Sequence, residues 1–212
     1  MKTENSHYIY IIISRTQTKF ARLLRMVGGM KYNHSAISLD RELSEMYAFS
    51  RPQHRSLFLG KLVRETLDRY TLKKNHKIPV VVFQLPVSLE QYAQIRNLFQ
   101  QIMLDSEYMY NLFSVLTYPI TRGFSTYKSF NCTEFAAHII KILDYPFPQP
   151  AYRYKPDDLV HILEPYLIFD GVLRDYMICQ DTDEQYFESY NLKMIYRNFC
   201  AMCKIIGRTY FS

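Results

Sequence analysis

The chain has 212 residues, a hydrophobic content of 48 % and a charged content of 22 %, which predict one globular domain, residues 1–212, of α+β or α/β type. The net charge is +6, but the basic residues are scattered, so we expect no specific binding to nucleic acid. The sequence has no apolar run of the length of a signal-peptide core or a membrane span, so we expect a cytoplasmic protein. Contact with a membrane surface stays open.

The first half of the chain alternates between strand and helix patterns. Ile and Tyr make up the apolar run of residues 8–13, which predicts a buried strand. The apolar residues that follow have helical spacing up to Gly28-Gly29, where the helix is expected to stop. Two alternating segments, residues 34–39 and 45–51, predict a hairpin with a polar turn at residues 40–44.

The second half begins with another strand and then becomes mainly helical. Ser88 and Gln91 form a capping-box pattern at the start of a predicted helix. Asp170-Gly171 predicts the turn of a last hairpin. The full set of predicted elements is a strand at 77–85, helices at 89–104, 131–143, 156–163 and 191–206, a helix followed by a loop within 108–126, and a hairpin within 167–178.

Cys132 has the strongest chemical signal in the sequence. Asn131 is a good N-cap and Glu134 follows it by three residues, which places Cys132 at the first helical position. The positive end of the helix dipole favours a thiolate over a thiol there, and backbone N–H groups at the same place can bind an oxyanion. The competing interpretation is a small buried cysteine.

His34 is the best candidate for a base that activates this thiol. Of the six histidines, it is the one at the start of a predicted strand; the others lie in a terminus, in polar loops, or in helices, as His138 and His161 do. A third polar group normally orients such an imidazole. If the hairpin turns near residue 42, Ser50 lies opposite His34. Tyr47 or Glu45 would take that place in another register, and Asp40, at the turn, is less suitable.

The three other cysteines predict no metal site. Cys200 and Cys203 form a Cys-x-x-Cys pair, but no second pair and no nearby histidine accompany them. Because they lie in an apolar helical segment, we expect two buried thiols. We also expect no cofactor.

Several of these segments together resemble the circularly permuted NlpC/P60 cysteine hydrolases, a papain-like group. Tyr32-Asn-His-Ser-Ala-Ile-Ser-Leu39 is similar to the histidine strand of that family, Asn131-Cys-Thr-Glu-Phe135 to its Cys-Ser/Thr-Glu motif, and Pro156-Asp-Asp-Leu159 to the segment after it. The histidine comes before the cysteine, which is the permuted order. The resemblance covers most of residues 8–160 and implies an antiparallel sheet packed against helices, among them the helix of the nucleophile, with a C-terminal extension from about residue 165.

The resemblance implies a thiol hydrolase, a peptidase or amidase, that acts on an amide or ester. Cys132 would be the nucleophile, His34 the base and Ser50 the group that orients it. The substrate would be a peptide, an amide or an acyl lipid. Two further functions stay open: an acyltransferase or thioesterase-like enzyme acting on lipids, and a binding module that has kept the fold without catalysis.

Overall fold

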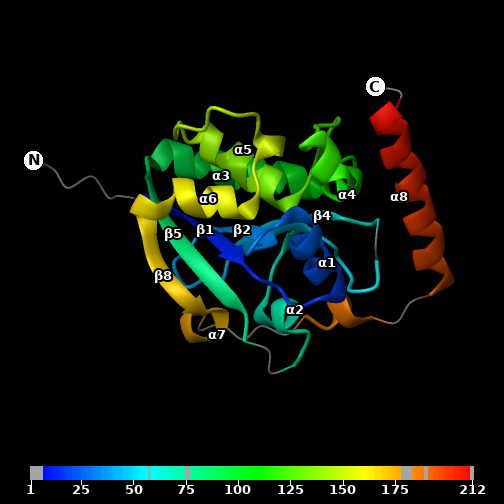
Figure 1. The fold of residues 1–212 in the computed structure, drawn as a ribbon, viewed down its shortest axis with the longest axis horizontal. Helices are drawn as coiled ribbons and strands as arrows, with labels where there is room; N and C mark the ends of the chain where they lie inside the picture. Colours follow the sequence, from blue (N-terminus) through cyan, green and yellow to red (C-terminus); the bar gives the residue numbers. More distant parts are fainter. Residues whose placement is uncertain (1–6, 57, 75–76, 178–182, 189–190, 211–212) are drawn as a thin grey trace, which may run out of the picture.

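The fold is built on an antiparallel sheet of six strands (Figure 1). A computed structural model describes residues 7–56, 58–74, 77–177, 183–188 and 191–210. The strand order is β4-β3-β2-β1-β5-β8, and all neighbouring strands are antiparallel. The strands are β1 (His7–Ser14), β2 (His34–Ser38), β3 (Met46–Ser50), β4 (Lys61–Arg64), β5 (Pro79–Val87) and β8 (Leu167–Val172), with β6 (Met109–Tyr110) and β7 (Ser129–Phe130) in a small parallel pair.

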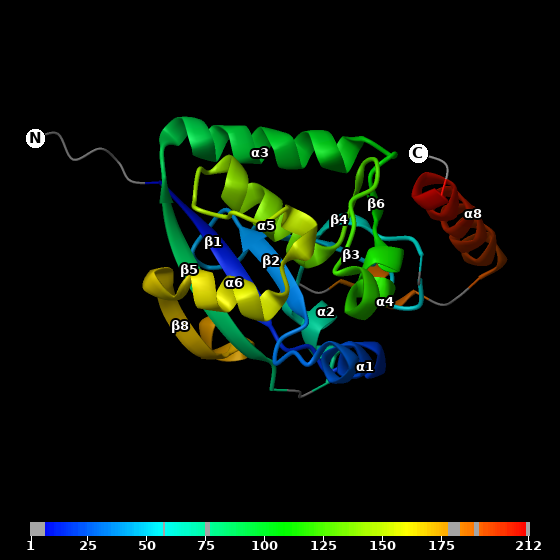
Figure 2. The same ribbon diagram turned by 45° about the horizontal axis from the view of Figure 1, so that its top comes forward.

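Helices cover both faces of the sheet (Figures 1 and 2). One face packs against α3, α5 and α6, and the other against α2 and α7. Helices α1 and α4 contact each other near one end of the sheet, and α8 lies beyond α4 at the outer edge. The helices are α1 (Lys19–Gly28), α2 (Leu67–Thr71), α3 (Leu89–Leu104), α4 (Leu112–Thr121), α5 (Cys132–Ile142), α6 (Pro156–Ile162), α7 (Leu173–Tyr176) and α8 (Leu192–Tyr210).

The central strand explains this three-layer arrangement. Ile9, Ile11 and Ile13 belong to the core under α3, α5 and α6, while Tyr10 and Ile12 belong to the core under α2 and α7. A strand that is apolar at every position must be covered on both faces. The predicted antiparallel sheet packed against helices is therefore confirmed at the level of an α+β fold.

The predicted hairpin at Asp170-Gly171 is wrong. Both residues lie inside β8, where Asp170 pairs with Val81 and Gly171 with Val80 of β5. The chain then enters α7 at Leu173, so no strand returns along β8 before Met177, and residue 178 lies outside the described residues. Strand β8 pairs with β5 at the edge of the sheet, and this long-range pairing outweighs the local turn preference of Asp-Gly.

The expectation of two buried thiols at Cys200 and Cys203 is also wrong, because both side chains are exposed. Helix α8 instead buries Ala201 and Ile205 against Met109. Ala201 and Ile205 therefore form the side of α8 that faces the domain, and Cys200 and Cys203 lie outside it. Among the described helices, none is both long and apolar enough to cross a lipid bilayer.

Candidate active site

Cys132 is the first residue of α5, as predicted, and a complete capping box holds it there. The side chain of Asn131 accepts a hydrogen bond from the backbone N–H of Glu134 (2.9 Å), and the Glu134 carboxylate accepts one from the N–H of Asn131 (3.2 Å). Cys132 is 7 % exposed. Cys132 therefore lies at the start of a fixed helix and lines a pocket.

The hairpin of β2 and β3 has the register that the sequence suggested. Ile37 pairs with Tyr47 and Ser38 with Met46, and the same register extended to the strand ends sets His34 level with Ser50. His34 is also paired across the sheet with Ser14 of β1. The histidine thus stands at the end of a central strand, where its side chain can reach beyond the sheet toward the start of α5.

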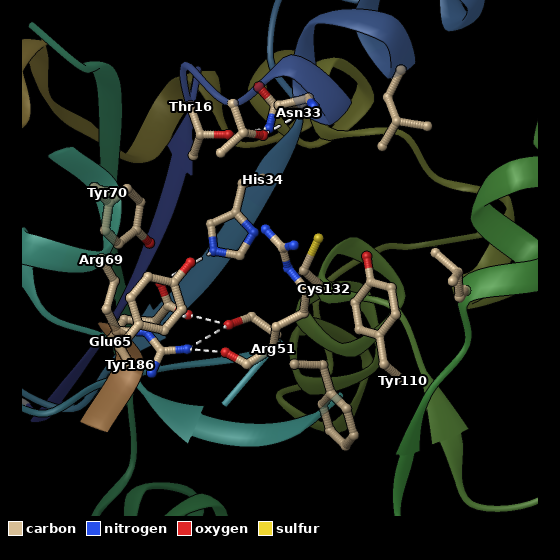
Figure 3. A pocket seen from close by; sticks show the side chains of 16 residues that line it. Thr16, Asn33, His34, Arg51, Glu65, Arg69, Tyr70, Tyr110, Cys132 and Tyr186 are labelled. Carbon is tan, nitrogen blue, oxygen red and sulfur yellow. Dashed lines mark hydrogen bonds and ion pairs between the residues drawn. The ribbon is translucent and has the colours of Figure 1, made fainter. Parts of the chain in front are cut away.

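The imidazole of His34 and the thiol of Cys132 point toward each other across the pocket (Figure 3). Burial alone would raise the pKa of Cys132, but the charge of His34, hydrogen bonding to it, and the backbone N–H of Ser35 together lower that pKa. Burial would lower the pKa of His34, but the negative charge on Cys132 and the carboxylate of Glu65 raise it. Both shifts favour the thiolate–imidazolium form of the pair.

Glu65 is the partner on the other side of the imidazole, and the sequence did not reveal it. Its Oε2 lies 3.6 Å from Nε2 of His34, which leaves the second ring nitrogen for Cys132 (Figure 3). Glu65 is 5 % exposed and immediately follows β4. Because a buried carboxylate fixes the orientation of the ring and stabilises its charged form, Glu65 makes the contact with His34 that was expected of Ser50.

Ser50 contacts this carboxylate instead of the histidine. Its hydroxyl donates to Oε1 of Glu65 at 2.5 Å. The expectation that Ser50 itself orients His34 therefore needs correction: the serine lies in the right place on β3, but it acts through Glu65. Neither Asp40 nor Tyr47 takes that role, because Asp40 accepts the N–H groups of Ser44 and Glu45 in the turn, and Tyr47 packs on Phe99.

Arg69 of α2 keeps Glu65 ionised. Its Nε lies 3.7 Å from Oε1 of Glu65, and its other nitrogens bond to Asp183 (3.1 Å), to Ser50 (3.1 Å) and to the carbonyl of Arg51. Burial would raise the pKa of Glu65, but the Arg69 guanidinium, His34 and Ser50 bring it well below its usual range. The buried carboxylate therefore carries a negative charge when it faces His34.

Other polar groups also lie close to the sulfur atom. The hydroxyl of Thr133 lies 3.9 Å from Sγ and shares a hydrogen bond with the hydroxyl of Ser35 (3.0 Å). The phenol of Tyr110 points toward Cys132 (Figure 3). Burial and the negative charge on Cys132 raise the pKa of Tyr110 far above its usual value, so the phenol keeps its proton and can donate it in a hydrogen bond.

Sequence reasoning could not have found Glu65, because no local pattern connects it with His34. It lies 31 positions further along the chain, next to a strand of four residues that the hydrophobic pattern does not mark. Tyr110 had a weak signal, since it precedes the Cys132 segment in a Tyr-rich stretch. Its position depends on the parallel pairing of Tyr110 with Phe130, which brings the two segments together.

Within the described ranges, no three His, Cys, Asp or Glu side chains are grouped in a way that could hold a metal ion. The pocket is lined by a thiol, an imidazole, a buried carboxylate and a phenol. Protein-family models, curated proteins and solved structures give no significant match to this chain.

Proposed function

We propose that this protein is a thiol hydrolase of the peptidase or amidase type, which cleaves an amide or ester through a Cys132 thioester. The observation that supports this most is the position of the His34 ring between Cys132 and Glu65. We further propose that the fold is the permuted NlpC/P60 arrangement, in which the histidine strand comes before the nucleophile helix. The order of β2 and α5 along the chain agrees with that proposal.

The proposed reaction begins at the sulfur atom. The Cys132 thiolate attacks the substrate carbonyl carbon and forms a tetrahedral intermediate. The imidazolium of His34 then donates its proton to the leaving amine or alcohol, the bond to the leaving group breaks, and a thioester remains on Cys132. Neutral His34 next takes a proton from water, which attacks the thioester and releases the carboxylic acid.

Two donors are available for the oxyanion of each tetrahedral intermediate. The backbone N–H of Cys132 belongs to the first turn of α5, where N–H groups have no carbonyl partner within the helix. The Tyr110 hydroxyl, which points toward the sulfur, supplies the second donor. Glu65 keeps the imidazole oriented while its charge changes, so it is a positioning residue in this scheme.

Alkylation of Cys132 tests the proposal. We expect iodoacetamide to label Cys132 at near-neutral pH in a variant that lacks the other three cysteines, and His34→Ala to slow that labelling. Without the imidazolium, burial raises the thiol pKa, and the thiolate fraction falls about tenfold for each pKa unit. The matched control is His161→Ala, which removes an exposed histidine of α6.

The outcome also separates an enzyme from a binding module. Equal labelling rates in His34→Ala and His161→Ala would contradict the proposed pair. Rapid labelling that depends on His34, together with turnover of a simple acetyl ester that His34→Ala abolishes, is the result expected of a hydrolase.

A further inference from the structure

Cys132 lies where two hollows of different character meet. The first, which we call the polar pocket, contains His34, Arg51, Glu65 and Arg69. The second, which we call the apolar groove, runs between α1 and α4, and its apolar lining includes Leu24, Val27, Met30, Val115, Leu116 and Pro119. Cys132 borders both hollows. A substrate whose carbonyl carbon lies at the sulfur atom can therefore extend one substituent into the polar pocket and the other into the apolar groove.

The groove opens to the surface along a strip of exposed apolar side chains. Met26 and Val27 of α1 are 74 % and 56 % exposed, and Leu116 and Ile120 of α4 are 47 % and 89 % exposed. A cluster of exposed apolar residues beside a nucleophile is typical of a binding site for an apolar ligand. The shape also matters, since a groove between two helices suits a flexible linear chain.

The polar pocket has a cation available for the other end of the substrate. Nη1 of Arg51 donates to the carbonyl of His54 (2.9 Å), and the guanidinium points into the pocket near His34 and Cys132 (Figure 3). Among the described residues, the carboxylates around this pocket are held by other groups: Glu65 by His34 and Arg69, and Asp183 by Arg69. The planar donor set of Arg51 therefore remains for an anion brought by the substrate.

We propose that the substrate is a long-chain acyl ester or amide with an anionic leaving group: the apolar groove holds the acyl chain, and Arg51 binds the carboxylate or phosphate of the leaving group. This inference rests on the proposed thiol hydrolase. The acyl carbon forms a thioester with Sγ of Cys132, and its bond to the leaving oxygen or nitrogen breaks. His34 gives that atom its proton, and water then releases the fatty acid and restores the thiol.

Chain-length dependence tests the groove. With nitrophenyl esters from acetyl to decanoyl, kept below their aggregation limits, kcat/KM is expected to rise about threefold to fourfold for each methylene that the groove buries. Leu116→Arg places a charge in the groove and is expected to reduce the ratio of decanoyl to acetyl kcat/KM at least tenfold. The matched control is Leu89→Arg, at an exposed leucine at the start of α3 and outside the groove lining, which is expected to keep the ratio of the unmodified protein.

Leaving-group charge tests Arg51. An ester of a carboxylated nitrophenol is expected to be preferred over the ester of plain nitrophenol, and Arg51→Gln to remove that preference, while the exposed Arg55→Gln keeps it. Comparison of an N-acylglycine with an acylglycerol phosphate then separates a carboxylate from a phosphate as the natural anion.

Failure of this inference differs from failure of the proposed function. A flat chain-length profile, or equal effects of Leu116→Arg and Leu89→Arg, would overturn the acyl groove, and no charge preference would overturn the role of Arg51. In either case, His34-dependent labelling of Cys132 and acetyl ester turnover still support a thiol hydrolase. If both of those are absent as well, the proposed function itself is wrong.

Discussion

At the scale of single residues, the carboxylate of Glu65 links the candidate nucleophile to the rest of the domain. It faces His34, accepts the hydroxyl of Ser50 and is paired with Arg69. The position of Ser50 opposite His34 was predictable, because strand register follows from a short hairpin turn and an alternating pattern. Glu65 was not predictable, because its contact with His34 depends on where β4 and α2 meet in space.

We expect Glu65→Gln to slow alkylation of Cys132 at pH 6–7 by about tenfold or more. The neutral amide no longer raises the His34 pKa, so the imidazolium that keeps Cys132 ionised is present in a smaller fraction of molecules. Ser50→Ala is the matched comparison and is expected to have the smaller effect, since Glu65 keeps its charge. The rate of alkylation against pH distinguishes them, and equal shifts for both variants would contradict this order of contacts.

Glu134 predicts an unusual dependence of stability on pH. Burial raises its pKa to about 8, against the opposing hydrogen bond from the backbone N–H of Asn131. Between its ordinary value near 4.5 and about 8, the native state therefore binds more protons than the unfolded state. Stability is expected to fall as pH rises through this window, by about 1.4 kcal/mol per unit of pKa difference.

Glu134→Gln keeps an acceptor for the capping box but has no proton to lose. We expect its free energy of unfolding to vary less between pH 5 and pH 8 than that of the unmodified protein, as measured by urea denaturation. Glu90→Gln is the control for removal of an exposed carboxylate. If Glu134→Gln and the unmodified protein have parallel pH profiles, the buried carboxylate does not titrate as described.

At the scale of elements, the sequence was most informative where a pattern is local. The capping box at Asn131, the glycine stop after α1 and the hairpin of β2 and β3 all follow from residues within a few positions of one another. The two wrong predictions concern residues whose environment depends on segments that are distant in the sequence. Asp170-Gly171 joins a strand because β5 is nearby, and Cys200 is exposed because α8 turns another stripe toward the domain.

The capping boxes of α3 and α5 allow a controlled test of how α5 positions its first residue. Asn131→Ala removes the side-chain acceptor for the Glu134 N–H and is expected to lower the free energy of unfolding by about 1 kcal/mol. It should also slow alkylation of Cys132, because the helix start that holds the sulfur frays. Ser88→Ala removes the equivalent cap of α3 and is expected to lower stability without altering Cys132 reactivity. Similar alkylation rates in both variants would mean that the cap contributes to stability alone.

At the scale of the whole molecule, the two cores on the faces of the sheet, of which the larger lies under α3, α5 and α6, are accompanied by a small third core at α8. The strands and helices α3, α5 and α6 share a broad apolar cluster, whereas α8 contributes Ala201 and Ile205 to a small cluster with Met109. Helix α8 therefore depends on few apolar contacts, and we expect it to open separately from the sheet. Hydrogen exchange in α8 should be faster than in α5.

Two substitutions test whether α8 unfolds separately from the sheet. Ile205→Ala, at a residue that is 2 % exposed, is expected to increase hydrogen exchange along α8 while the midpoint of urea unfolding of the sheet changes little. Ile139→Ala, at a fully buried residue of α5, is expected to cost about 2–5 kcal/mol and to lower that midpoint clearly, because it leaves a cavity in the large core. If Ile205→Ala instead lowers the global midpoint as much as Ile139→Ala, α8 unfolds together with the sheet. The active site lies on the large core, so we expect Cys132 alkylation to be insensitive to Ile205→Ala.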